Sequence, residues 1–242
     1  MKLTKNTILI TGGTSGIGYE LGKSLLEKNN KVILLGRNPA KLQEAASQGF
    51  QAIQCDLSDT QEIENAVIRI QNKYPDVNIL INNAGVQYNY LFTEEAVSPD
   101  RIRKEMDINA AGQIILTQLL IPLLATSPKA LIINTTSGLG AFPKSDGLVY
   151  SASKAAMRNF TTGLRFALKD TAINVLEFIP PVTDTGMTSG RDEKKMPVKA
   201  LISHVIPQIE KERRVVTVPS MRIFLRIAFL FPALAHKILD KK

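Results

Sequence analysis

The sequence contains few of the residue types from which disulfide frameworks and metal centres are built. Its 242 residues include one cysteine, Cys55, and two histidines, His204 and His236. A single cysteine excludes an intramolecular disulfide and a multi-cysteine zinc site, and two histidines argue against a histidine-built metal centre. We therefore expect no bound metal and a chain suited to a reducing compartment.

Long uninterrupted apolar runs are also missing. The apolar stretch Ile8–Ile10 near the N-terminus is too short for the core of a signal peptide and is typical of a buried strand. A membrane-spanning helix needs roughly 18 apolar residues, and the longest candidate, Ile223–Ala235, is interrupted by Arg226 and Pro232. We expect a cytoplasmic protein without a transmembrane helix.

Positive charge is concentrated at one end of the chain. The protein has 30 Lys and Arg against 22 Asp and Glu, a formal net charge of +8. Residues 211–242 carry +6 of this charge and residues 1–210 carry only +2. A near-neutral body argues against a nucleic-acid-binding protein.

Short apolar runs alternate with longer amphipathic segments, as in βα units around a parallel sheet. The expected strands are 7–10, 31–35, 51–54, 78–81, 130–135 and 172–178, and the expected helices are 16–29, 39–47, 60–74, 99–126 and 150–169. We predict an α/β fold in which residues 1–210 form one domain around a Rossmann-type, doubly wound parallel sheet. Residues 183–200 lack a regular pattern and are expected to form a mobile loop or short lid over the substrate.

A glycine-rich turn, TGGTSGIG at residues 11–18, joins the first expected strand to the first helix. Glycines permit a tight turn and let backbone N–H groups approach a pyrophosphate at the helix N-terminus. An ordinary strand-to-helix turn could have the same composition. The position at the first βα junction favours a dinucleotide site.

The end of the second strand bears on which dinucleotide binds. Folds that prefer NAD usually have an acidic residue here for the ribose 2′-hydroxyl, whereas this sequence has Gly36 followed by Arg37. Because a guanidinium can pair with a 2′-phosphate through two hydrogen bonds, we predict NADP(H), with NAD(H) as the alternative. Arg37 could instead belong only to a solvated loop.

Tyr150 and Lys154 are four residues apart in an expected helix and therefore share one face. A nearby ammonium favours the phenolate, so Lys154 is expected to lower the pKa of Tyr150 toward the range useful in acid–base catalysis. Ser137 follows the strand 130–135 and could direct its hydroxyl to the same place.

Five motifs occur in one order: TGxxxGxG, Asn82-Asn83-Ala84-Gly85, Asn109, Ser137 and the Tyr150–Lys154 pair. Over residues 5–185 this order resembles the short-chain dehydrogenase/reductase family in its compact form of about 250 residues. The resemblance implies that Tyr150 is the general acid/base and that Ser137 orients the substrate oxygen. It also implies that Lys154 binds the nicotinamide ribose and that Asn109 supports a water-linked proton relay.

The same resemblance implies which residues bind the cofactor. They are Gly12, Thr14, Ser15, Gly16, Ile17 and Gly18 at the pyrophosphate, Arg37 at the ribose, Asp56 and Leu57 at the adenine, Asn83, Ala84, Gly85, Tyr150 and Lys154 beside the nicotinamide half, and Pro180, Val182 and Thr185 at the carboxamide and phosphate. Simpler roles stay open, because Asn82 and Asn83 could serve only a turn and Asp56 only a helix cap.

One segment departs from the family pattern. Where the family commonly has Pro-Gly, this sequence has Pro180-Pro181, followed by Val182 and, further on, Thr185-Gly186. Pro181 has no N–H and a fixed φ, so we expect a stiffer backbone beside the nicotinamide. The segment is similar to that of a bacterial subgroup of the family, the DltE-like oxidoreductases.

Residues 211–242 are expected to form a basic, amphipathic helical extension. Ile223, Phe224, Ile227, Leu230 and Phe231 recur at helical spacing, and Arg222 and Arg226 are expected on the other side. Such a helix can lie in a membrane interface, so residues 220–239 could contact the inner face of the membrane. A helix packed over the substrate pocket or against another subunit has the same periodicity.

Together these observations predict an NADP(H)-dependent oxidoreductase that transfers hydride between nicotinamide and a carbonyl or secondary alcohol. The apolar faces near the C-terminus favour a hydrophobic small-molecule substrate, and we expect a homodimer or homotetramer. Two alternatives are a cofactor-binding regulatory or sensor protein without significant turnover and a membrane-surface, lipid-metabolising reductase. A sensor has no need of the tyrosine–lysine pair, which argues against the first.

Overall fold

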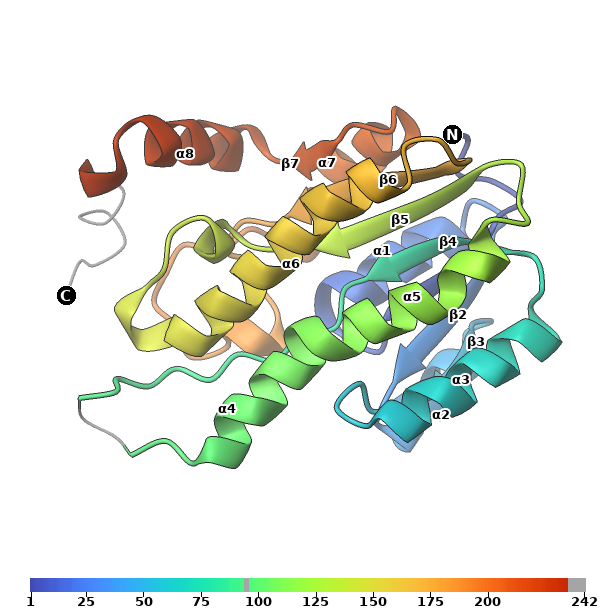
Figure 1. Cartoon of the computed structure of the whole chain (residues 1–242), viewed down its shortest axis with the longest axis horizontal. Coiled ribbons are helices and arrows are strands. Elements are labelled where there is room, and N and C mark those ends of the chain that lie inside the picture. Colours follow the sequence, from blue (N-terminus) through green and yellow to red (C-terminus); the bar gives the residue numbers. More distant parts are fainter. Residues whose placement is uncertain (94–95, 235–242) are drawn as a thin grey trace.

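Seven parallel strands form the central sheet of the computed structural model, which describes residues 1–93 and 96–234 (Figure 1). They are β1 (Thr7–Thr11), β2 (Lys31–Gly36), β3 (Gln51–Gln54), β4 (Val77–Asn82), β5 (Ala130–Thr135), β6 (Ile173–Ile179) and β7 (Val215–Thr217). Their order, β3-β2-β1-β4-β5-β6-β7, is that of a doubly wound sheet. The fold prediction is confirmed, and six strands agree with the expected ranges to within one residue at each end.

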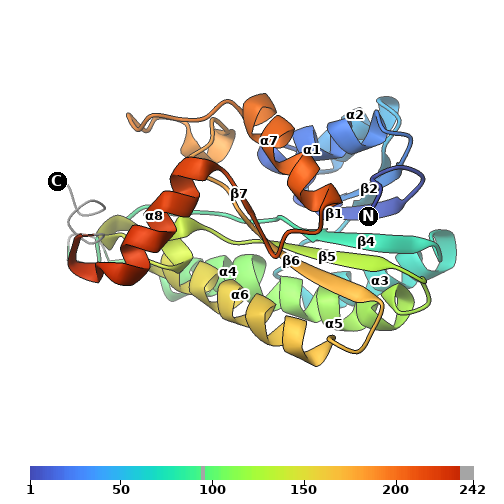
Figure 2. The ribbon, with the colours of Figure 1, turned by 90° about the horizontal axis from the view of Figure 1, so that it is seen from above.

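Helices cover both faces of this sheet (Figure 2). One face carries α1 (Gly16–Leu26), α2 (Pro39–Ser47) and α7 (Val198–Glu210). The other carries α3 (Thr60–Lys73), α4 (Pro99–Met106), the π-helical turn η1 (Asp107–Ala111), α5 (Gly112–Leu124) and α6 (Leu148–Ala167). The remaining elements are the short 3-10 turns η2 (Gly138–Gly140), η3 (Ser145–Gly147) and η4 (Gly186–Thr188), and the helix α8 (Pro219–Leu230).

The inner strands are largely apolar because both faces of the sheet are covered, whereas three of the four residues of the edge strand β3 are exposed. In β1, Ile8 and Ile10 pack in the core beneath α1 and α7, whereas Leu9 packs in the core on the side of α3 and α5. All three side chains are fully buried. Successive strand residues point to opposite faces, so a doubly covered strand reads as an unbroken apolar run.

One helical run, Pro99–Leu124, is long and apolar enough by composition to cross a membrane, although we expected no such segment from the sequence. Half of its most apolar window is buried within the protein. Leu116, Leu120 and Leu124 are fully buried in the core. The run is therefore accounted for as a core helix packed on the sheet.

The structure differs from the predicted organisation near the C-terminus. Helix α7 was not predicted, and its first turn occupies positions 198–200 of the segment expected to be a loop. Strand β7 was not predicted either, although it pairs in parallel with β6 from Val215 to Thr217. A domain boundary at residue 211 would therefore separate β7 from the sheet to which it belongs.

The loop between β6 and α7 is closed at its base by backbone contacts. The Met196 N–H donates to the Val182 carbonyl at 2.9 Å, and the Asp184 N–H donates to the Met196 carbonyl at 2.9 Å. These bonds hold the two ends of the loop together, so residues 184–195 form a single loop that starts and ends at the same place after β6.

The last helix does not have the two faces that its sequence predicts. Phe224 and Ile227 are half-buried and Ala228 is fully buried, but Ile223 and Leu230 are exposed on the side that carries Arg222 and Arg226. Helix α8 ends at Leu230, and positions 235–239 of the expected helix lie outside the described residues.

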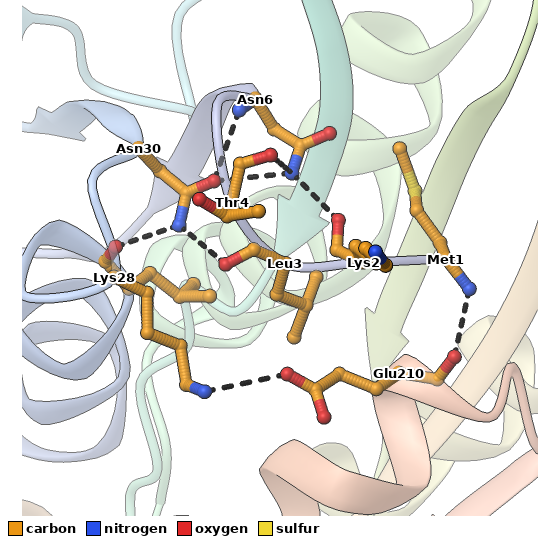
Figure 3. Close-up of polar contacts among 9 residues, drawn as sticks. Met1, Lys2, Leu3, Thr4, Asn6, Lys28, Asn30 and Glu210 are labelled. Atoms are coloured by element: carbon orange, nitrogen blue, oxygen red, sulfur yellow. Dashed lines mark hydrogen bonds and ion pairs between the residues drawn. The ribbon is translucent and has the colours of Figure 1, made fainter.

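A hollow in the surface lies at the amino-terminal edge of the sheet, close to the start of β1, among the residues drawn in Figure 3. It measures about 550 Å³ and is lined by residues 1–4 together with Lys28 and Glu210. The Asn30 amide holds this segment by donating to the Leu3 carbonyl at 2.9 Å, and Lys28 pairs with Glu210 at 3.3 Å. Parallel-sheet enzymes bind ligands at the opposite, carboxyl edge, so we assign this hollow no part in the reaction.

Helix α5 begins where the chain presses against the segment that follows β3. A Cβ atom built on Gly112 would lie 2.0 Å from the Leu57 carbonyl oxygen, whereas one built on Gly163, in α6, would meet nothing within 4 Å. We predict that Gly112→Ala lowers the free energy of unfolding by about 1–3 kcal/mol through overpacking. Gly163→Ala, the matched control, should raise it by about 0.5–1 kcal/mol because glycine is a poor helix former.

Urea unfolding of both variants measures these differences. If the two variants had the same free energy of unfolding, α5 would be able to move away from Leu57 without loss of stability. That result would contradict the prediction that Gly112→Ala overpacks this contact.

Candidate active site

The carboxyl ends of β1, β4, β5 and β6 bring the motif residues to one edge of the sheet (Figure 1). β1 and β4 are neighbours, and the chain leaves them in opposite directions across the sheet, which is the point where doubly wound folds open a crevice for a ligand. The glycine turn follows β1 and residues 83–85 follow β4. Ser137 follows β5, and the Pro180-Pro181 segment follows β6.

The glycine turn lies directly against the end of β4. Gly12 and Gly16 have φ values of +62° and +55°, a region that favours glycine. A Cβ atom on Gly12 would lie 2.7 Å from the Ala84 Cα, and one on Gly18 would lie 2.4 Å from the Asn83 amide nitrogen. The glycines are therefore required both by backbone conformation and by the proximity of the next strand.

Thr11 joins the two halves of this crevice, a role that the sequence did not reveal although the residue opens the glycine motif. Its hydroxyl accepts from the backbone N–H groups of Asn83 at 2.9 Å and Ala84 at 3.0 Å. The Asn83 amide in turn donates to the Thr11 carbonyl at 3.2 Å. These bonds fix the position of residues 83–85 relative to the turn.

The start of α1 is suited to a pyrophosphate. Its N-cap, Ser15, is exposed and makes no side-chain hydrogen bond to the helix, so the first N–H groups have no capping acceptor. Side chains cap other helices of the protein: Asn38, Asp59 and Ser98 do so at α2, α3 and α4. Thr185 lies over the turn, 3.2 Å from a Cβ atom built on Gly16. Glycines, free N–H groups and a threonine hydroxyl fit a dinucleotide phosphate.

The end of β2 has no room for a bulky residue at position 36. A Cβ atom on Gly36 would lie 3.1 Å from the Thr14 side chain. The next residue, Arg37, is exposed, and its charge reaches Asp56. Burial alone would raise the pKa of Asp56, but hydrogen bonds from Ser58 and the charges of Lys104 and Arg37 outweigh it and lower the pKa. Asp56 is therefore ionised at neutral pH.

Helix α6 brings the tyrosine and the lysine to the Ser137 segment. Tyr150 and Lys154 are both buried, and the Lys154 ammonium lies 5.8 Å from the centre of the Tyr150 ring. The Ser137 side chain lies close enough to the Tyr150 hydroxyl to lower its pKa. The Lys154 Nζ donates to the Thr135 carbonyl at 2.9 Å, which ties α6 to the end of β5. Three of the four predicted catalytic side chains are thus in one place.

Burial, not the lysine, dominates the pKa of Tyr150. Burial raises this pKa to about 12, while the hydrogen bond from Ser137 and the charge of Arg191 act in the opposite direction. Burial also lowers the pKa of Lys154 to about 8. The expectation that Lys154 lowers the tyrosine pKa is wrong for this structure, because both groups have lost their contact with water.

Asn109 lies in the π-helical turn η1, and its side chain holds the backbone that follows β4. Its Oδ1 accepts from the Val86 N–H at 2.8 Å, and its Nδ2 donates to the Val86 carbonyl at 2.8 Å and to Ser153 at 3.1 Å. A Cβ atom on Gly85 would lie 3.4 Å from Asn109 Oδ1 and 3.7 Å from Lys154 Nζ, so both residues border Gly85. The proton relay through Asn109 stays a prediction.

Gln113 is a further buried residue that no motif indicated. Its amide donates to the backbone carbonyls of Ala84 at 2.9 Å and Asn109 at 2.9 Å. It therefore connects the cofactor-side residues after β4 with the asparagine of η1. The one signal in the sequence is that Gln113 follows Asn109 by four positions, so the two side chains share one helix face.

Asn82 has a structural role, beyond the turn considered from the sequence. Its amide donates to Thr117 and to Asn134, each at 2.8 Å, and Asn134 donates to Thr161 at 2.9 Å. This buried chain links α5, β4, β5 and α6, the elements that position Asn109, Ser137 and Tyr150. Buried polar groups joined in this way specify one register of the packed elements.

Two glycines bring the segment after β5 into close contact with its neighbours. A Cβ atom on Gly140 would lie 2.7 Å from the Lys154 backbone, so η2 is seated directly on α6. A Cβ atom on Gly138 would lie 3.1 Å from the Met221 sulfur. The rings of Phe142 and Phe224 meet edge to face with centroids 6.5 Å apart. The inner face of α8 therefore borders the Ser137 segment.

The segment after β6 closes the site from the other side. Pro180 and Thr185 are half-buried, whereas Val182 is 37% exposed. The Pro181 carbonyl accepts from the Thr183 hydroxyl at 2.8 Å. Met187 of η4 reaches back to within 3.9 Å of a Cβ atom built on Gly85. Within residues 1–93 and 96–234, no cluster of three or more His, Cys, Asp or Glu could hold a metal ion.

Comparisons with known proteins agree with this geometry. Residues 6–196 match the family model described as short chain dehydrogenase. The chain belongs to the short-chain dehydrogenase family. It is 40% identical over 210 residues to the uncharacterized oxidoreductase DltE of Bacillus subtilis (strain 168), covering 84% of this chain and 82% of that one. The resemblance to the family and to its DltE-like subgroup is confirmed.

Two solved structures show the same fold. A short chain dehydrogenase from Burkholderia cenocepacia J2315 in complex with NADP superposes with a TM-score of 0.88 at 24% identity, over 100% of both chains. One from Burkholderia phymatum in complex with NAD gives a TM-score of 0.87 at 18% identity, over 100% of this chain and 99% of that one. The short-chain dehydrogenase described here is thus an oxidoreductase with the full fold of its family.

The buried lysine gives stability a definite dependence on pH. The folded protein holds the pKa of Lys154 at about 8, below its ordinary value of 10.5, so the unfolded chain binds more protons between these two values. The free energy of unfolding should therefore rise with pH over this interval. We predict that the wild type gains up to about 3 kcal/mol relative to Lys154→Met between pH 7 and 10.5.

Urea unfolding at several pH values measures this gain. Lys73→Met, which removes an exposed lysine of α3, is the matched control. The wild type should show no such gain in the free energy of unfolding relative to Lys73→Met. A difference between wild type and Lys154→Met that stays constant with pH would contradict the lowered pKa.

Proposed function

We propose that this short-chain dehydrogenase is an NADP(H)-dependent reductase of hydrophobic carbonyl compounds, which it interconverts with secondary alcohols. The observation that carries the proposal is the meeting of Ser137, Tyr150 and Lys154 beside the crevice of the glycine turn. A nicotinamide cofactor bound in that crevice supplies or accepts the hydride. The residues of the chain itself handle the oxygen and its proton.

In the reducing direction Tyr150 gives a proton to the substrate oxygen. Burial keeps its hydroxyl protonated at neutral pH, since its pKa is raised to about 12. Ser137, whose side chain acts on the same hydroxyl, would hold the carbonyl oxygen against it. With a pKa of about 8, Lys154 is mostly charged at pH 7, and its ammonium lies 5.8 Å from the centre of the Tyr150 ring.

The surroundings of this site support an apolar substrate. Met221 and Phe224 from α8 approach η2, directly after Ser137. Met187 approaches Gly85 from the loop above β6 and is 40% exposed. Contact with these side chains stabilises a bound apolar group because it removes apolar surface from water. A charged group would find no hydrogen-bonding or ionic partner among them.

The choice of NADP(H) is supported by the end of β2. Gly36 carries no carboxylate that would repel a 2′-phosphate, and the exposed guanidinium of Arg37 follows it. We assign the cofactor site to Gly12 to Gly18, Asp56, Leu57, Asn83 to Gly85, Pro180, Val182 and Thr185. The contacts of Gly12 with Ala84, of Gly18 with Asn83 and of Gly16 with Thr185 support this assignment. Assembly as a homodimer or homotetramer and a cytoplasmic location stay predictions.

The role of Tyr150 is tested by removing its hydroxyl. We predict that Tyr150→Phe loses at least about 100-fold in kcat, because general acid–base catalysis typically contributes this much, while NADPH still binds. Tyr74→Phe is the matched control, since Tyr74 lies after α3 and its hydroxyl bonds to Gln51. Steady-state kinetics on lipophilic ketones and NADPH fluorescence titration provide the two measurements. Full activity of Tyr150→Phe would refute the mechanism.

The cofactor preference is tested at Arg37. We expect the protein to bind NADPH more tightly than NADH and Arg37→Ala to narrow the gap by about tenfold, the loss of one charge-assisted contact of 1.4 kcal/mol. Arg69→Ala removes an exposed arginine of α3 and should leave the ratio unchanged. Fluorescence titration gives both affinities. Equal affinities in the unaltered protein would contradict this reading of the Gly36–Arg37 pair.

A further inference from the structure

The outer face of α8 exposes large apolar side chains beside arginines. Ile223, Phe229 and Leu230 are 57%, 84% and 65% exposed, and Phe231 and Leu234 continue the apolar surface beyond the helix. Arg222 and Arg226 lie on the same side of the helix. Single exposed apolar residues are ordinary, but five within twelve positions form a patch that marks an interaction surface.

A basic pocket opens next to this patch, between α7 and α8. It measures about 280 Å³ and is lined by His204, Gln208, Arg213, Thr217, Pro219, Arg222, Ile223 and Arg226. No carboxylate lines it. In the part of the chain that the structure describes, none of its three guanidinium groups takes part in an ion pair. The pocket therefore concentrates positive charge that no neighbouring acid neutralises.

The pocket is built by directed hydrogen bonds. The Arg222 guanidinium donates to Gln208 Oε1 and to the Val215 carbonyl, each at 3.3 Å, and the Gln208 amide donates to the Thr217 carbonyl at 2.9 Å. These bonds hold the Arg222 head group at the junction of α7, β7 and α8. Its remaining N–H groups, with those of Arg213 and Arg226, are available to an anion.

We propose that this pocket and the outer face of α8 together bind the surface of a membrane that contains anionic phospholipids. The arginines would take the phosphate groups, and Phe229, Leu230 and Phe231 would enter the boundary between headgroups and acyl chains. A membrane interface is the partner that satisfies both features at once. The pocket is slightly smaller than typical sites for drug-sized ligands, which suits a headgroup.

Other occupants satisfy only one of the two features. A second copy of the chain, related by a twofold axis at this face, would bring two basic surfaces with no lining carboxylate into one interface, and like charges repel. A free phosphate would neutralise the arginines but would leave Phe229 and Leu230 in water. The charge balance agrees with this choice, because residues 211–242 carry +6 of the net charge and residues 1–210 only +2.

The placement has a consequence for the reaction, which rests on the proposed function. The inner face of α8 meets η2 next to Ser137, while its outer face would lie on the lipid. Both faces belong to one helix of 12 residues. An apolar substrate dissolved in the bilayer would then reach the site beside the helix that anchors the protein.

Vesicle sedimentation tests the proposal directly. The full chain is mixed with phosphatidylcholine vesicles, with or without about a third phosphatidylglycerol, and we expect sedimentation with the anionic vesicles alone. Arg226→Gln should weaken binding by about fivefold, the contribution of one cation near an anionic surface, and Phe229→Ser by about tenfold or more. Added inorganic phosphate should compete only weakly, because it cannot replace the apolar contacts.

Matched variants control for charge, apolar exposure and folding. Arg69→Gln removes the same charge from α3, and Phe166→Ser removes a side chain of α6 that is 71% exposed. Both should bind vesicles like the wild type. NADPH titration of every variant shows whether the variant is folded and binds the cofactor, independently of vesicle binding. A failure of the proposed reaction can therefore be distinguished from a failure of the membrane surface.

Four results would count against the proposal. One is the absence of sedimentation with anionic vesicles, and another is binding that Arg226→Gln and Phe229→Ser leave unchanged. In the third, analytical ultracentrifugation shows that Phe229→Ser has lost an oligomer that the wild type forms, and the wild type does not bind vesicles. That result would assign the face to a second copy of the chain. Strong competition by millimolar phosphate would instead reduce the site to a soluble-anion pocket and would also count against a membrane surface.

Discussion

The site depends on the close approach of the glycine turn to the end of β4. With 2.7 Å between a Cβ built on Gly12 and the Ala84 backbone, this junction has no space for any side chain. The Thr11 hydroxyl then bonds to two successive N–H groups of the next strand. Because residues 83–85 are fixed in this way, Asn109 and Gln113 find backbone partners there, and the turn, η1 and α6 keep one relative position. A cradle for a dinucleotide is thus a consequence of strand packing.

Burial gives the catalytic pair its electrostatics. A tyrosine and a lysine four residues apart on a helix suggest mutual charge stabilisation, but in this fold both lie beneath η2 and lose water. Desolvation favours the neutral form of each, which raises one pKa and lowers the other. The tyrosine therefore starts as a neutral acid, and it becomes a phenolate when it gives its proton to the substrate oxygen. The burial of Tyr150 and Lys154 is set by the tertiary fold, so their spacing in the sequence could not reveal it.

What the sequence predicts well is what local chemistry determines. Doubly covered strands such as β5 are apolar runs that stand out in any reading, and the glycine turn, Ser137, Tyr150 and Lys154 sit in short motifs with fixed spacing. Strand β7 escaped prediction because it has three residues and gains its hydrogen bonds only from β6. Gln113 and Gly112 escaped because their importance comes from distant backbone, the Ala84 carbonyl and the Leu57 carbonyl. Long-range contacts of single residues leave no periodic signal.

Helix α8 shows why periodicity alone assigns faces poorly. Its apolar residues occupy more than half of the helix circumference, so hydrophobic spacing permits several orientations on the protein. Contacts with Gly138 and Phe142 select one in which Met221, Phe224 and Ala228 face inward. That choice leaves Ile223 and Leu230 exposed beside the arginines, and no carboxylate of residues 1–93 or 96–234 forms an ion pair with Arg222 or Arg226. The same packing that completes the substrate side of the site therefore creates the outer surface, and one helix serves both.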